Sequence, residues 1–263
     1  MTELIYQSNP WVLPLLMLVL LSLAIELPYR FMQRACAVSE RSDAFNAVQA
    51  GLLTLASFVL GLSFSQASAR FDARRELVVK EANAIGTTWL RGDQLPAVES
   101  ARFRAILTDY TAARLHAYET PRDPELYART IAHSNASQEA LWQIASSALR
   151  AHPNDLGLSL LMQTLNDTID VSAEQLQALT THVPTIVVEL TLALVVLGAL
   201  SLGIRFAADR SRPAALSALY VVASVLVFSM MVDYDRPQTG FVVVNLNPLR
   251  AQLDTMQTPL RRP

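Results

Sequence analysis

The chain has little charge, a single cysteine and few glycines for its 263 residues. Because Cys36 is the only cysteine, the disulfide-stapled secreted scaffolds are excluded. The 8 glycines and the 52% hydrophobic content exclude collagen-like and disordered chains. Charged residues make up only 17% of the chain, whereas about a quarter is usual in soluble domains. This deficit, with a mean hydropathy of +0.28, indicates a membrane protein.

Positive charge is not in excess either. The 21 basic and 23 acidic residues give a net charge of −2, and no strongly basic block is present. Binding of nucleic acid through bulk charge is therefore not expected. The sequence has no glycine-rich phosphate loop and no G-x-S-x-G nucleophile turn, and its 4 histidines lack the spacing of metal ligands. We therefore expect no enzyme activity, no bound metal and no cofactor.

Four long apolar stretches, two near each end of the chain, predict membrane-spanning helices. The first two run from Leu4 to Ile25 and from Ala44 to Ala69, without charge. The last two run from Val183 to Ile204, interrupted by Glu189, and from Pro213 to Val232. Each is long enough, because a helix crosses the hydrocarbon core in about 20 residues. The first stretch lacks the basic flank and cleavage site of a signal peptide, so we expect it to remain as a span.

More than half of the charged side chains lie between these apolar ends, in residues 67–182. This part shows the period of helices and no useful alternation of period two. Its first helix should continue the second membrane helix, because neither proline nor glycine separates them. Further helices are expected over about 97–119, from the turn at 120–124 to about 151, and from near 156. The sequence thus predicts an all-α integral membrane protein with spanning helices 1 and 2 in 1–66, a helical extramembrane domain in 67–182, spanning helices 3 and 4 in 183–233, and a C-terminal tail in 234–263.

Arginines in the two short loops predict the orientation. They are Arg30, Arg34 and Arg41 after the first helix, and Arg205, Arg210 and Arg212 between the third and fourth. Four spans place these loops on one side of the membrane, and the positive-inside tendency makes that side cytoplasmic. The N-terminus and the central domain would then face outward. Four basic residues just past the second helix count against this orientation: Arg70, Arg74, Arg75 and Lys80.

Acidic residues within the apolar stretches are candidates for function, because charge is costly inside a bilayer. Glu26 lies at the end of the first helix, four residues before Arg30. Glu189 lies near the start of the third helix, close to the other face of the membrane. Both can therefore also reach the membrane interface, which favours a structural role over a functional one.

Charges gather where the second and fourth helices leave the membrane. With four spans these exits share one face, so Arg70 and Arg74 are expected to pair with Asp233 or Asp235. The pattern predicts either an interfacial ion-pair network or a charged mouth that concentrates ions. The full set of residues is Arg70, Asp72, Arg74, Arg75, Glu81, Asp233, Asp235 and Arg236.

On the second helix, Thr54, Phe58 and Leu62 repeat every four residues and share one face. Small residues around this row would let neighbouring helices approach closely, so helix packing explains the row taken alone.

The stretch from Gly51 to Leu95 resembles the signature of the bestrophin-like domain family of bacterial membrane proteins. Its R-F-D-x-R-R element begins at Arg70 and is followed by E-A-N-A-I-G-T over Glu81 to Thr87 and by W-L-R over Trp89 to Arg91. Shorter elements match in order along the chain: Glu26 to Arg30, Leu165 to Asp170, His182 to Pro184 and Asp233 to Gly240.

This resemblance implies a bestrophin-like fold in the bacterial inner membrane. Bestrophins are pentameric anion channels whose second helix lines the pore with apolar rings. The resemblance thus implies a homo-oligomer in a lipid bilayer that conducts small anions, with Thr54, Phe58 and Leu62 lining the pore. Bestrophins carry their large domain in the cytoplasm, opposite to the orientation from the arginine count. Calcium needs about six to eight oxygen ligands. Asp233 and Asp235, just after the fourth helix, offer too few carboxylates for a calcium site. The alternative function is a non-conducting sensor or scaffold whose helical domain binds a partner.

Overall fold

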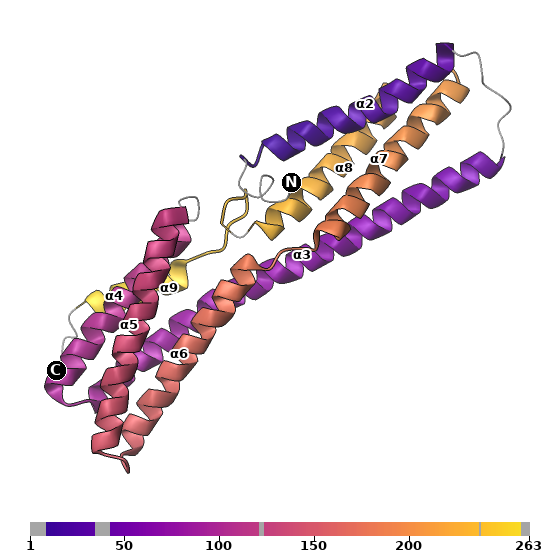
Figure 1. Ribbon diagram of the computed structural model, residues 1–263. Coiled ribbons are helices and arrows are strands. Elements are labelled where there is room, and N and C mark those ends of the chain that lie inside the picture. Colours follow the sequence, from indigo (N-terminus) through magenta and orange to yellow (C-terminus); the bar gives the residue numbers. More distant parts are fainter. Residues whose placement is uncertain (1–8, 35–42, 121–123, 237, 259–263) are drawn as a thin grey trace. The chain divides into compact units, whose positions relative to one another are not determined.

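The computed structural model describes residues 9–34, 43–120, 124–236 and 238–258 (Figure 1). Cys36 and Arg41 lie outside them. All regular structure in the described residues is helical, which confirms the predicted all-α class. The elements are α2 (Val12–Arg34), α3 (Asp43–Arg91), the 3-10 turn η1 (Gly92–Gln94), α4 (Ala97–Glu119), α5 (Pro124–Ala151), α6 (Leu156–Thr180), α7 (Thr185–Ala208), α8 (Ala214–Asp235) and α9 (Asn247–Gln257).

The chain divides into two compact units. The membrane unit comprises Met1–Phe71 and His182–Val242, and the central unit comprises Asp72–Thr181 and Val243–Pro263. Helix α3 contributes residues to both. The C-terminal residues 247–257, expected to be tail, form helix α9 of the central unit.

Four helices are long and apolar enough to span a membrane, as the sequence predicts: α2, α3, α7 and α8. The limits of the first helix differ from the apolar stretch. Helix α2 begins at Val12 and continues past Ile25 to Arg34, with Pro28 inside it. Hydropathy marks only the apolar residues, whereas the helix also includes the polar residues from Glu26 to Arg34.

In the membrane unit, α2, α7 and α8 pack on one another around a core of aliphatic and aromatic side chains. A side chain at Gly203 of α7 would collide with the backbone carbonyl of Ile25 in α2, so the glycine allows the two backbones to approach closely. Helix α3 joins this core through Leu60 and Ala67. The hydroxyl groups of Ser63 and Thr191 lie 3.0 Å apart and link α3 to α7.

Aromatic rings gather where α2 begins and α8 ends. The rings of Trp11 and Phe241 meet edge to face at 4.9 Å, and Tyr234 stacks on Phe71 at 5.2 Å. Tyrosine and tryptophan favour the membrane–water interface. At the opposite end, the Gly203 contact and a salt bridge between Arg212 and Glu26 join the C-terminal parts of α2 and α7 to the start of α8. The ends that carry the two arginine-rich loops are therefore together, as four spans require.

The central unit is built from the C-terminal part of α3 with α4, α5, α6 and α9. One face of this part of α3 is apolar and buried: Val78, Ala82, Ile85 and Trp89 are each at most 5% exposed. Asp72, Glu76 and Lys80, spaced four residues apart, are exposed, and the Lys80 amino group lies 3.2 Å from the Glu76 carboxylate. Helices α4, α5 and α6 lie where the sequence predicts them. Helix α9 packs on α4, where Arg250 donates to the Glu119 carboxylate at 2.7 Å.

Candidate functional site

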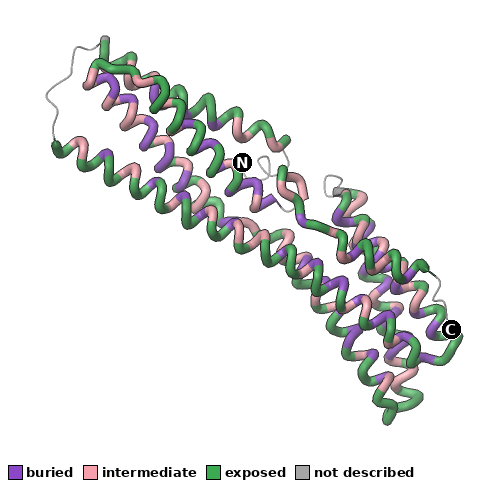
Figure 2. The backbone as a smooth tube through the Cα atoms, turned by 180° about the vertical axis from the view of Figure 1, so that it is seen from behind, coloured by how far each residue is buried: buried purple, intermediate pink, exposed green. Residues whose placement is uncertain are grey.

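The row that the sequence singled out on α3 points away from the core of the membrane unit. Phe58 is 62% exposed, Leu62 is 49% exposed and Thr54 is exposed as well. The Thr54 hydroxyl donates to the Ala50 carbonyl of its own helix at 2.8 Å. Figure 2 shows much of this part of α3 in the exposed class. Its buried residues follow at spacings of seven, four, three and four: Gln49, Ala56, Leu60, Ser63 and Ala67.

The exposed face of α3 continues with polar side chains inside the apolar stretch. Gln66 lies one turn after Leu62 and is exposed, as is Ser65 beside it. One further turn along, Arg70 is partly exposed. An amide facing hydrocarbon without a partner is costly. This face is therefore better suited to water or to another protein surface than to lipid tails.

Asp233 is an anchor for the turn that follows α8. Its carboxylate is 4% exposed and accepts hydrogen bonds from the backbone N–H groups of Phe241 and Val242, both at 2.8 Å. A side chain at Gly240 would collide with this carboxylate. The first aspartate of the D-x-D-R-P-x-x-G pattern thus lies against its last glycine and binds the backbone that follows.

Asp235 binds the backbone just before α7 begins. Its carboxylate is buried, accepts a hydrogen bond from the Val183 N–H at 3.0 Å and lies 3.5 Å from His182 Nδ1. The H-V-P and D-x-D-R-P elements, about 50 positions apart in the sequence, therefore form one structural cluster. Arg236, next in the chain, is buried.

Arg74 binds backbone carbonyl groups at the C-terminal end of α6. Its guanidinium is buried and donates to the backbone carbonyls of Ala178 at 2.9 Å and Thr181 at 2.7 Å. A cation at a helix C-terminus stabilises the partial negative charge of the last carbonyls. Its neighbours Asp72 and Arg75 are exposed. The pairing of Arg70 or Arg74 with Asp233 or Asp235 stays a prediction.

The two acids within the apolar stretches have different surroundings. Glu26 forms salt bridges with Arg30 on its own helix and with Arg212 at 2.7 Å. The local pattern indicates the Arg30 contact, but not the one with Arg212, which is 186 positions away. Glu189 is exposed on α7 and has no ion-pair partner in the described part of the chain.

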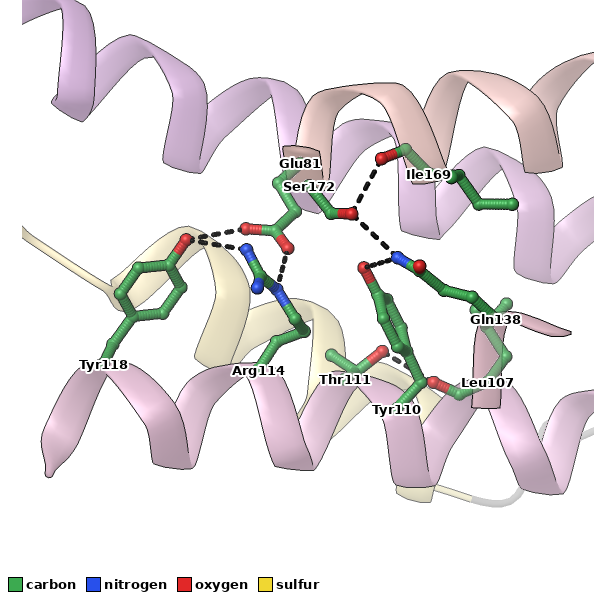
Figure 3. A network of polar contacts seen from close by, with 9 residues as sticks. All are labelled: Glu81, Leu107, Tyr110, Thr111, Arg114, Tyr118, Gln138, Ile169 and Ser172. Carbon is green, nitrogen blue, oxygen red and sulfur yellow. Dashed lines mark hydrogen bonds and ion pairs between the residues drawn. The ribbon is translucent and has the colours of Figure 1, made fainter. Parts of the chain in front are cut away.

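Glu81 belongs to a buried network in the central unit (Figure 3). Its carboxylate is fully buried, lies 2.6 Å from Arg114 Nε and accepts a hydrogen bond from the Tyr118 hydroxyl at 3.1 Å. Further along α4, the Tyr110 hydroxyl accepts a hydrogen bond from the Gln138 amide, which also donates to Ser172. The network therefore ties α3, α4, α5 and α6 together. It lies in the core of the central unit rather than at a surface mouth.

Burial sets the ionisation of this network. Burial and then the Glu81 charge raise the pKa of Tyr118 well above its usual 10.0, and the same causes raise the pKa of Tyr110. Burial lowers the pKa of Arg114, but the Glu81 charge, the two tyrosines and the hydrogen bond to Glu81 together outweigh burial, so the net shift is upward. Both tyrosines therefore stay neutral beside the salt bridge of Glu81 and Arg114.

Arg114 was not predicted as a site residue, although the sequence carries a signal for it. Phe103, Leu107, Tyr110, Arg114 and Ala117 repeat at helical spacing, so Arg114 stands on an otherwise apolar stripe. A lone charge at such a position predicts a buried partner.

The described residues contain no cluster of three or more histidine, cysteine, aspartate or glutamate side chains arranged to hold a metal ion.

The bestrophin-like domain model matches residues 17–249 of this chain. Crystal structures of a bacterial bestrophin homologue from Klebsiella pneumoniae have a similar fold. One is 18% identical over 93% of this chain and 94% of that chain, with a TM-score of 0.68. Another is 19% identical over 95% and 96%, with a TM-score of 0.69. At these identities the likeness shows the fold alone. No curated protein matches the sequence.

Proposed function

This chain belongs to the bestrophin-like domain family, and we propose that it is one subunit of a homo-oligomeric membrane channel that conducts anions. By resemblance to bestrophins the assembly is a pentamer, with α3 of each subunit around the axis. The protein would lie in the bacterial inner membrane. No enzymatic step is assigned to it.

The exposed face of α3 is the observation that supports this proposal. A spanning helix that buries one side in its own unit must place the other against lipid, water or another copy. Gln66, exposed within the apolar stretch, disfavours lipid. Around a symmetry axis, Phe58 and Leu62 would form consecutive apolar rings, and apolar constrictions gate by dewetting. Arg70, two turns beyond Leu62, would bring positive charge to the mouth and favour anions.

Cross-linking tests the position of α3. The chain has one cysteine, so Cys36→Ser gives a background without thiols. In that background, Phe58→Cys should be joined between subunits by a short bifunctional maleimide, giving covalent oligomers on a denaturing gel. Ala56→Cys is the matched control, because Ala56 is 4% exposed and lies on the packed side of the same helix. We expect it to remain uncross-linked.

The mass of the detergent-purified protein completes the test. An oligomer with linked Phe58→Cys subunits supports the channel. An oligomer in which only the control links would place α3 away from the axis. A monomer would contradict the channel and would favour the alternative function, a non-conducting sensor or scaffold.

A further inference from the structure

A cavity of about 320 Å³ opens in the membrane unit between α2, the end of α7 and the start of α8. Leu18, Ile25 and Phe206 line it together with Val221 and Val222, so most of its wall is apolar. Its size is at the lower end of ligand pockets, enough for part of a hydrocarbon chain. The cavity plays no part in the proposed pore.

The polar end of this cavity carries excess positive charge. Glu26 lines it and is bridged by Arg30 and by Arg212, so two cations share one carboxylate. The Arg30 and Arg212 side chains are 64% and 59% exposed, respectively. Because a guanidinium has five N–H donors, both retain donors for a further acceptor.

The start of α8 adds to this charge. Ala214 and Ser217, in its first turn, line the cavity. That turn contains no acidic residue, and no side chain caps it. Its unpaired N–H groups and the positive end of the helix dipole favour an anion beside Arg212.

We propose that this cavity binds an anionic phospholipid, with its phosphate at Arg212 and Arg30 and the upper part of one acyl chain along Leu18 and Val221. The cavity lies among spanning helices, where hydrocarbon chains are the surrounding solvent. Its charged end belongs to the short loops, where a headgroup would lie. Basic pockets between spanning helices are suited to anionic headgroups. A free anion would use the arginines and leave the apolar wall empty.

Native mass spectrometry of the detergent-purified protein, titrated with dioleoylphosphatidylglycerol, tests the proposal. Arg212→Gln should weaken binding about fivefold, because it removes one cationic contact to the phosphate. Glu26→Gln should strengthen binding, because it removes the carboxylate that competes for both arginines. Opposite effects of two changes to one salt bridge would not result from structural damage alone. Arg210→Gln is the control, since Arg210 lies in the same loop but does not line the cavity.

The apolar part is tested separately. Ala218 lines the cavity, and Ala218→Phe should fill it and weaken lipid binding with both arginines retained. Dioleoylphosphatidylcholine should bind more weakly than phosphatidylglycerol to the parent protein. Three results would overturn the proposal: equal binding of the two lipids, equal weakening by Arg210→Gln and Arg212→Gln, or displacement of the lipid by millimolar inorganic phosphate. The last would show a free-anion site instead.

Discussion

At the scale of single residues, Glu81 and Arg114 form a salt bridge that is buried in the central unit. Removing one partner of a buried pair leaves the other charged and desolvated, at a cost of about 3–5 kcal/mol. Glu81→Ala should therefore lower the free energy of unfolding by this amount. Glu76→Ala is the control on the same helix, because its pair with Lys80 is solvent-exposed and worth at most about 1 kcal/mol. Similar losses in the two variants, measured by thermal unfolding, would show that burial adds nothing to the Glu81 pair.

The buried tyrosines predict how stability depends on pH. Burial raises the pKa of Tyr110 and Tyr118 above 10.0, so the folded state keeps protons that the unfolded chain releases. Their contribution is fully present below pH 10 and is lost as the pH rises towards their folded pKa. Each tyrosine should lower the unfolding free energy by about 1.4 kcal/mol per pH unit in that range.

Thermal unfolding between pH 8 and pH 11 measures this slope. Tyr118→Phe removes one of the two groups, so its stability should be lower at pH 8 but should fall less steeply above pH 10. A variant that keeps the full slope of the parent protein would show that Tyr118 does not stay neutral in the folded state.

At the scale of elements, the close approach of α2 and α7 depends on Gly203. A methyl group there would collide with the Ile25 carbonyl, which belongs to backbone and cannot rotate away. Gly203→Ala should therefore push the two helices apart and cost about 1–3 kcal/mol. The control is Gly51→Ala, which places the same methyl group on α3, where no described atom beyond its own stretch of helix backbone lies within 4 Å. Equal melting temperatures of the two variants would contradict the packing of α2 on α7.

The sequence predicts helices well where local chemistry marks their ends. Helix α4 covers the expected residues because Pro96 precedes it and two further prolines follow it closely in the sequence. Helix α9 was missed because it has 11 residues, and its buried side chains, Leu249 and Met256, form too short a pattern to distinguish from a tail.

Partners distant in sequence could not be predicted. The apolar stretches of α2 and α8 are visible to hydropathy, but the salt bridge between Glu26 and Arg212 depends on how the helices pack. Asp233 and Asp235 are visible in the sequence as a charged element. Their contacts with the N–H groups of Phe241 and Val183 follow only from the folded turn.

At the scale of the whole molecule, the arginines of the short loops predict that the central unit faces outward. A cysteine at Asn135, exposed on α5, reports this orientation in the Cys36→Ser background. It should react with a membrane-impermeant maleimide in spheroplasts without permeabilisation. Labelling only after permeabilisation would show that the central unit faces the cytoplasm, as the large domain of bestrophins does.

Halide flux from liposomes that contain the purified protein tests the central claim most directly. If Phe58 forms the narrowest ring of the pore, Phe58→Ala removes one ring side chain from every subunit at once. The account predicts that halide flux rises in this variant above that of the parent protein, and that Arg70→Glu lowers the selectivity for chloride. Absence of flux from both the parent protein and Phe58→Ala would contradict the account.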